Sequence, residues 1–189
     1  MARVPMLNAA STTTPEVVEL FKSAQEMGLE RFMNQFGALA HHPPLMHAIH
    51  ELMRAYYTQS VVDKKYLELA ILLISRLNRC SYCVVHHTPP AITEGISAEQ
   101  LEAIENDSWR DSDLFDSTER LVLRFAEQMN QRQGRIDDSL FEELLEHFDQ
   151  QQIVELTVRC GMCEFFNRFN EALQLDIEPE ARRLLQEIQ

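Results

Sequence analysis

The stretch DKKYLELAILLISRLNRCSYCVVHHTPPAITEG, residues 63–95, decides the fold of this chain. Its first half, roughly Lys64 to Leu77, is apolar nearly all round, a pattern typical of a helix that is buried on every side. Asp63 precedes this run and is placed to cap its first turn. We therefore expect a buried central helix around which the rest of the chain packs.

The second half of the stretch carries a different pattern. Asn78 and Arg79 interrupt the apolar run, and a new helix is expected to begin near Cys80. Pro89 and Pro90 fall inside that helix, where a proline lacks the N–H of the helical hydrogen bond and clashes with the preceding turn. We expect the two prolines to kink or end it.

Outward from this stretch, apolar residues recur at helical spacing, only five glycines occur, and no alternating strand pattern persists. The sequence predicts an all-α fold in a single domain, residues 1–189, with the polar segment 106–116 as a long surface loop. Capping, proline and periodicity signals place further helices at Pro15, from Pro43 to near Tyr57, after Ser97, at Ser117, from Leu140 to Phe148, from Asp149 to about Leu173, and at Pro179.

Composition excludes several classes of function. The formal net charge is −13, from 30 acidic and 17 basic side chains, and no run of Lys or Arg supplies the positive surface that a phosphate backbone requires. The first residues lack the apolar core of a secretory signal, and the longest apolar run is far too short to cross a bilayer. We expect a cytoplasmic protein that binds neither nucleic acid nor membrane.

The four cysteines fall in two C-x-x-C pairs, which in a reducing compartment more often exchange disulfides or bind metal than staple a fold. Cys80 and Cys83 are one turn apart, and His87 follows four residues later on the same face. Cys80 is expected near a helix N-terminus, where unpaired amides and the helix dipole favour a thiolate. Glu68, a carboxylate inside an apolar helix, is a candidate general base because burial without a partner is costly.

Glu68, eleven intervening residues and then CSYCVVHH from Cys80 to His87 resemble the signature of the carboxymuconolactone decarboxylase superfamily, in its alkylhydroperoxidase D branch. Ala91 and Gly95 continue the pattern, and the resemblance covers residues 63–95. It implies an alkylhydroperoxidase D-like helical bundle that assembles as a trimer or hexamer. The best-known members carry histidine before the second cysteine, where this chain has Tyr82, as many relatives do.

The resemblance also implies a function. In that family the cysteine pair reduces hydroperoxides and is re-reduced by a dithiol partner, such as a lipoyl protein or a thioredoxin-like protein. Glu68 and His87 would relay protons, Tyr82 would lie beside them, and a redox-active Cys80–Cys83 disulfide would take the place of a cofactor. The family implies that Cys83 is the deeper thiol, whereas the helix dipole favours Cys80 as the more acidic one, so the attacking thiol stays open.

Alternatives remain beside this interpretation. The same fold serves redox sensors without turnover and carboxymuconolactone decarboxylase-like lyases, although those lyases generally lack the cysteine pair. A zinc site would need more ligands than Cys80, Cys83 and a histidine supply. Cys160 and Cys163 continue an apolar stripe and are interpreted as core residues. The polar side chains at Asn167, Arg168 and Asn170 are interpreted as a solvated face or a subunit contact.

Overall fold

The computed structural model describes residues 2–131 and 134–188, and within these ranges helices are the only regular secondary structure. The all-α prediction is therefore confirmed. The chain divides into two compact units, residues 61–169 and residues 1–60 with 170–189, and the single-domain interpretation stays a prediction. No helix in the described ranges combines the length and apolarity needed to span a bilayer.

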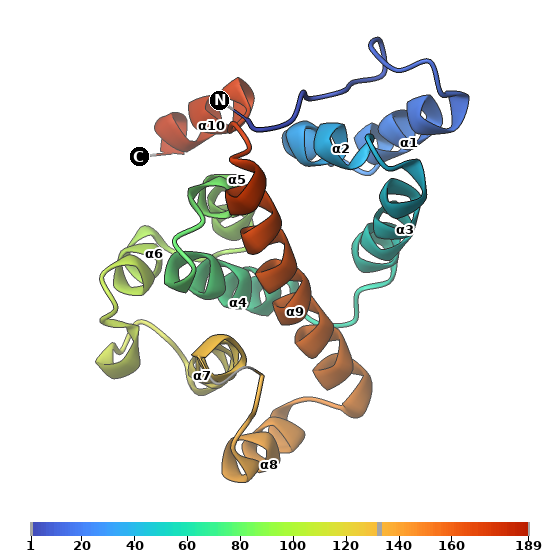
Figure 1. The fold of residues 1–189 in the computed structure, drawn as a ribbon. Helices are drawn as coiled ribbons and strands as arrows, with labels where there is room; N and C mark the ends of the chain where they lie inside the picture. The colour runs from blue at the N-terminus through green and yellow to red at the C-terminus, as the bar shows by residue number, and fades with distance from the viewer. Residues whose placement is uncertain (1, 132–133, 189) are drawn as a thin grey trace. The chain divides into compact units, whose positions relative to one another are not determined.

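The unit of residues 61–169 is built around helix α4 (Figure 1). This helix packs against α5 and α7, and also against α6. The bounds of the helices in this unit are α4 Lys64–Leu77, α5 Ser81–Thr93, α6 Ala98–Glu105, the 3-10 turn η2 Trp109–Asp111, α7 Ser117–Gln131, α8 Asp138–His147 and the greater part of α9 Gln150–Leu173. The helix expected over Lys64 to Leu77 thus has the bounds read from the sequence.

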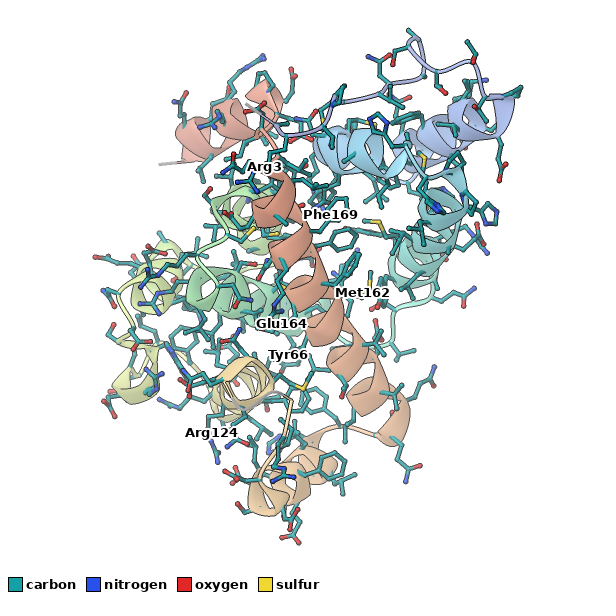
Figure 2. The ribbon with its side chains drawn as sticks, viewed as in Figure 1. Arg3, Tyr66, Arg124, Met162, Glu164 and Phe169 are labelled. Atoms are coloured by element: carbon teal, nitrogen blue, oxygen red, sulfur yellow. The ribbon has the colours of Figure 1, made fainter. Side chains whose placement is uncertain are left out.

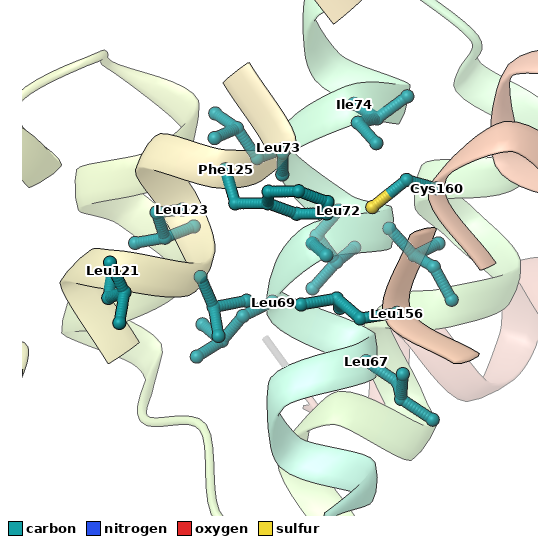
Figure 3. Close-up of a cluster of buried hydrophobic side chains, with 14 of the residues drawn as sticks. Leu67, Leu69, Leu72, Leu73, Ile74, Leu121, Leu123, Phe125, Leu156 and Cys160 are labelled. Carbon is teal, nitrogen blue, oxygen red and sulfur yellow. The ribbon is translucent and has the colours of Figure 1, made fainter. Parts of the chain in front are cut away.

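Apolar side chains of α4 point to every side, which explains its central place. Leu69, Leu73 and Ile74 have no exposed surface, and they form one cluster with side chains of α7 and α9 (Figure 3). At the edge of this cluster Tyr66, labelled in Figure 2, packs edge-on against Phe148 with ring centroids 5.7 Å apart. Burial of such side chains stabilises the unit by roughly 1.5–3 kcal/mol each.

The other unit holds α1 Pro15–Glu26, the 3-10 turn η1 Glu30–Phe32, α2 Met33–Leu39, α3 Pro43–Gln59, the last residues of α9 and α10 Pro179–Ile188. Buried polar contacts join its two ends in sequence. The Glu178 carboxylate accepts a hydrogen bond of 2.7 Å from the backbone N–H of Asn34. The amide of Gln35 donates one of 3.0 Å to Asn170, which therefore lies in this unit and not on a solvated face.

Helix α5 does not end at its prolines, contrary to one of the expected outcomes. It runs to Thr93 with Pro89 and Pro90 inside it. Side-chain hydroxyls bond carbonyls on both sides of the prolines, from Thr88 to Val84 and from Thr93 to Pro89. Burial in the last turn, where Ala91 is inaccessible, keeps the helix against the core despite the two missing donors.

The segment 106–116 differs from the expected surface loop. Trp109 in η2 and Phe115 are almost wholly buried and belong to the core cluster, so the segment is fixed by two aromatic anchors among polar neighbours. The residue that caps helix α7 also lies one position earlier than expected. Asp116, not Ser117, accepts the N–H of Glu119 at 2.8 Å, and the Glu119 carboxylate accepts the N–H of Asp116, a reciprocal arrangement like a capping box.

Candidate functional site

A tight turn between α4 and α5 places the first cysteine. After Leu77, Arg79 adopts a left-handed backbone with φ 56°, and the N–H of Cys80 bonds the carbonyl of Ser75 at 2.9 Å while that of Arg79 bonds Arg76. These two hydrogen bonds are those of a Schellman motif, which closes a helix C-terminus. Because the next helix starts at once, Cys80 becomes the N-cap residue of α5.

Cys80 and Cys83 therefore occupy the first turn of α5, at its cap and three residues on. Both are present as thiols and both are buried, with 0% and 4% of their surface exposed. The pKa of Cys83 lies well above its ordinary value because its S–H is hydrogen-bonded to Cys80 and because it is buried; the neighbouring Cys163 raises it further, whereas a hydrogen bond from Asn167 lowers it. The net effect is that Cys83 holds its proton more tightly than an ordinary thiol.

Glu68 and His87 meet across the α4–α5 contact. The Nδ1 atom of His87 lies 2.8 Å from Oε2 of Glu68, and the two side chains are only 12% and 10% exposed. An ionised carboxylate only accepts hydrogen bonds, so His87 donates through Nδ1–H, and a neutral ring then has Nε2 as its basic nitrogen. The contact orients the imidazole one helical turn beyond Cys83.

Tyr82 lies on a neighbouring face of α5. Its ring stacks on that of His86, with centroids 4.0 Å apart and planes 19° from parallel, and Nδ1 of His86 is 2.5 Å from the carbonyl oxygen of Tyr82. Both residues are buried. The predicted site residues Glu68, His87, Cys80 and Cys83 thus lie on the α4–α5 contact, and Tyr82 joins a histidine that the sequence interpretation had not singled out.

A group of polar side chains lies where α9 meets α4; the sequence interpretation did not single out Ser75 and assigned Asn167 to a solvated face or a subunit contact. Cys163 is 3.3 Å from the Ser75 hydroxyl, and the Asn167 amide donates to the same hydroxyl at 3.2 Å. Asn167 is 1% exposed, so it is not part of a solvated face. Two signals were available: Ser75 interrupts an apolar helix, and Asn167 follows Cys163 by four residues, on the same face of its helix.

The second C-x-x-C pair divides between two environments. Cys160 and Cys163 are both members of the buried core cluster, as expected from the apolar stripe. Burial raises the pKa of Cys163 to about 12, and burial likewise raises the pKa of Cys160. Cys163 also faces the polar group behind Cys83. In the described part of the chain, no three His, Cys, Asp or Glu side chains are placed to hold a metal ion together.

Comparisons with known proteins agree with the α4–α5 pattern. Residues 43–128, which include Glu68, Cys80, Cys83 and His87, match the model of the Carboxymuconolactone decarboxylase family. The uncharacterized protein YnjA of Escherichia coli (strain K12) is 32% identical over 117 residues, which cover 62% of this chain and 63% of YnjA. The match thus spans less than two thirds of that relative.

Two solved structures share the whole architecture. The alkylhydroperoxidase AhpD core of a peroxidase-related protein from Ralstonia eutropha JMP134 has a TM-score of 0.78 at 20% identity, covering 95% of this chain and 94% of its own. The debrominase Bmp8, in complex with 2,3,4-tribromopyrrole, has a TM-score of 0.73 at 22% identity, covering 100% of this chain and 98% of its own. At these identities the likeness shows a common fold.

Proposed function

Since the chain belongs to the carboxymuconolactone decarboxylase superfamily and has the alkylhydroperoxidase D-like fold, we propose that it is a thiol-dependent peroxidase that reduces hydroperoxides. One observation carries the proposal: Cys80 and Cys83 share the first turn of α5, and His87, held by Glu68, follows on the same helix. This arrangement offers two electrons from a dithiol and an acid–base pair at the same α4–α5 contact.

In the proposed first step Cys80 is the attacking thiolate. Its place at the cap of α5 exposes its sulfur to the positive end of the helix dipole, while the S–H of Cys83 donates to it. The thiolate attacks one oxygen of the hydroperoxide, the O–O bond breaks, and Cys80 becomes a sulfenic acid. In the same step Nε2 of His87 takes the thiol proton of Cys80, and the Glu68–His87 pair then gives this proton to the departing alcohol.

In the second step the Cys83 thiol attacks the sulfenic sulfur, which gives the Cys80–Cys83 disulfide and releases water. A dithiol reductant, a lipoyl protein or a thioredoxin-like protein, then returns the pair to thiols. Overall one hydroperoxide and one dithiol yield an alcohol, water and a disulfide. Because both sulfurs are buried, substrate and reductant reach them only when covering side chains move.

The test measures consumption of cumene hydroperoxide by the purified chain with dihydrolipoamide as reductant. Cys80→Ser and Cys83→Ser are expected to abolish turnover, whereas Cys160→Ser, in the apolar core, is the matched cysteine control and keeps it. With a sulfenic acid probe, Cys83→Ser is expected to accumulate the label on Cys80. If hydroperoxide forms the disulfide once and neither dihydrolipoamide nor thioredoxin supports turnover, the chain is a redox sensor.

A second candidate reaction is reductive debromination, because the match to Bmp8 extends over the whole chain. The same dithiol balances it: an aryl bromide and two thiols yield the arene, bromide, a proton and the disulfide. Bromide release from 2,3,4-tribromopyrrole, assayed beside the hydroperoxide with the same variants, decides between them. Faster cysteine-dependent release of bromide than consumption of hydroperoxide would assign this chain to debromination.

We also propose that the chain forms a homo-oligomer, a trimer or hexamer. Large apolar side chains are exposed in the unit of residues 61–169, among them Val154 and Val158 on α9, which are 62% and 40% exposed. They follow one another at a spacing of four residues and so share a helix face. A second copy of the chain would cover this face.

A further inference from the structure

A chain of hydrogen-bonded side-chain amides runs from the half-buried Asn130 and Asn78 to the buried Asn167, and the proposed reaction with peroxide does not use it. The Asn130 amide on α7 donates to Glu164 on α9 and, at 2.8 Å, to the side-chain oxygen of Asn78. The Asn78 amide donates at 2.8 Å to the oxygen of Asn167. The Asn167 amide in turn donates to Ser75 at 3.2 Å. Three asparagines and a glutamate thus join α7, the end of α4, and α9.

The direction of these hydrogen bonds is fixed at one end. An asparagine amide presents an oxygen on one side and an NH₂ group on the other, and nothing in an isolated chain of amides decides which way each one points. Glu164, which projects from α9 (Figure 2) and also pairs with Arg168, has two acceptor oxygens and no donor in its carboxylate form. Its carboxylate therefore turns the NH₂ of Asn130 toward itself.

The orientation is passed from amide to amide. The second N–H of Asn130 meets the oxygen of Asn78, so the NH₂ of Asn78 must face Asn167 and the oxygen of Asn167 must face Asn78. The S–H of Cys163 has two acceptors in reach, that same oxygen at 3.8 Å and the carbonyl of Ile71 at 3.6 Å. The NH₂ group of Asn167 therefore lies on the opposite side, where it donates to Ser75 and to the sulfur of Cys83.

We propose that Glu164, Asn130 and Asn78 act as positioning residues that hold an N–H donor of Asn167 against the sulfur of Cys83, so that Cys83 is stabilised as a thiolate. Asn130, Glu164 and Asn167 lie beyond the range 43–128 that matches the family model. The device is thus built largely from residues of this chain outside the shared motif. An opposite orientation would present the amide oxygen to Cys83 and repel its negative charge.

The Asn167 N–H donor matters when the Cys80–Cys83 disulfide is reduced, a consequence that rests on the proposed dithiol function. When a reductant thiolate attacks Cys80, a sulfur–sulfur bond forms between them, the Cys80–Cys83 bond breaks, and Cys83 leaves with the electron pair. A leaving thiol departs faster when its thiolate is more stable. Burial and Cys163 oppose that thiolate, and the Asn167 N–H is the group that favours it.

The experiment measures ionisation of Cys83 directly and needs no turnover. In a Cys80→Ser background, the rate of iodoacetamide alkylation at Cys83 is followed against pH by peptide mass spectrometry, which separates Cys83 from the thiols of Cys160 and Cys163. Asn167→Asp is an isosteric change that presents a charged acceptor. It is expected to raise the pH at which the alkylation rate is half-maximal, the midpoint, and to slow alkylation at neutral pH about tenfold. Glu164→Gln, which frees the orientation, is expected to slow it about threefold.

Glu171→Gln is the matched control, because it removes an equal charge from an exposed position of α9. It should leave the midpoint where it is in the Cys80→Ser parent. Midpoints in Asn167→Asp and Glu164→Gln equal to that of the parent would overturn the proposal. Should Asn167→Asp fail to fold, Glu164→Gln decides the matter alone, since its unfolding temperature reports folding and its midpoint reports orientation. A chain inactive toward hydroperoxides that still shows both shifts would refute only the proposed function.

Discussion

Replacement of Cys160 by serine tests whether this cysteine belongs to the core, apart from the proposed redox pair Cys80 and Cys83. Cys160 has no exposed surface and lies in the cluster that holds Phe125 and Leu156 (Figure 3). Burial raises the pKa of its thiol, so the side chain stays neutral and packs as a small apolar group. Serine keeps nearly the same shape and replaces the sulfur with a hydroxyl.

The cost follows from this environment. A hydroxyl without a partner in apolar surroundings costs about 1–3 kcal/mol. A buried serine in a helix can bond the carbonyl four residues earlier, here that of Leu156, which returns about 1 kcal/mol. We expect Cys160→Ser to lose about 1 kcal/mol of stability, which for a chain of this length lowers the unfolding temperature by about 2–4 °C.

The assay pairs thermal unfolding with hydroperoxide turnover well below the transition. Cys160→Ala removes the sulfur and adds no polar atom, so it should unfold at a temperature between those of the wild type and Cys160→Ser. Both variants should keep turnover close to that of the wild type. Loss of turnover in Cys160→Ser as complete as in Cys80→Ser, with little change in unfolding, would refute the assignment of Cys160 to the core.

Three further outcomes are expected. Glu68→Gln should lower kcat/KM for cumene hydroperoxide roughly 10²-fold, because the His87 ring loses its carboxylate partner; unchanged kinetics would remove this pair from the mechanism. In the folded chain the pKa of Cys163 is raised from 9.0 to about 12. The stability that comes from burying its neutral thiol is therefore fully present below pH 9 and is lost as pH rises toward 12. Stability measured by urea unfolding should then fall more steeply in wild type than in Cys163→Ala, by about 2 kcal/mol near pH ~10.5. Val158→Glu should reduce the mass measured by light scattering, and an unaltered oligomer would place the subunit contact elsewhere.

Local signals in the sequence were enough for the framework. Asp63 caps α4 through the N–H of Lys65, and Ser97 with Gln100 forms the expected capping box of α6. Each of these contacts joins residues only two or three positions apart, so their spacing alone predicts them. The aromatic anchors Trp109 and Phe115 were missed because a polar, acidic segment hides two apolar residues that tertiary packing selects.

Only those parts of the site that lie close together in the sequence could be predicted from it. The spacing of Cys80, Cys83 and His87 along one helix is visible in the sequence. The hydrogen bond from Asn167 to Ser75 joins residues 92 positions apart, and nothing local tells which face of α9 meets α4. A polar side chain on an amphipathic helix is equally consistent with solvent until its partner is known.

The polar residues of α4 nevertheless carry a pattern that sequence analysis can use. Glu68 and Ser75 are two helical turns apart, so they share a face of a helix that is otherwise apolar. A polar group on such a helix is costly unless it is hydrogen-bonded, and each of these two has its partner on a different neighbour, His87 on α5 and Asn167 on α9. One helix therefore sets the position of the Glu68–His87 pair and of the Asn167 amide. An apolar helix interrupted by polar residues seven positions apart, directly before a C-x-x-C, indicates a dithiol that is supported from two sides.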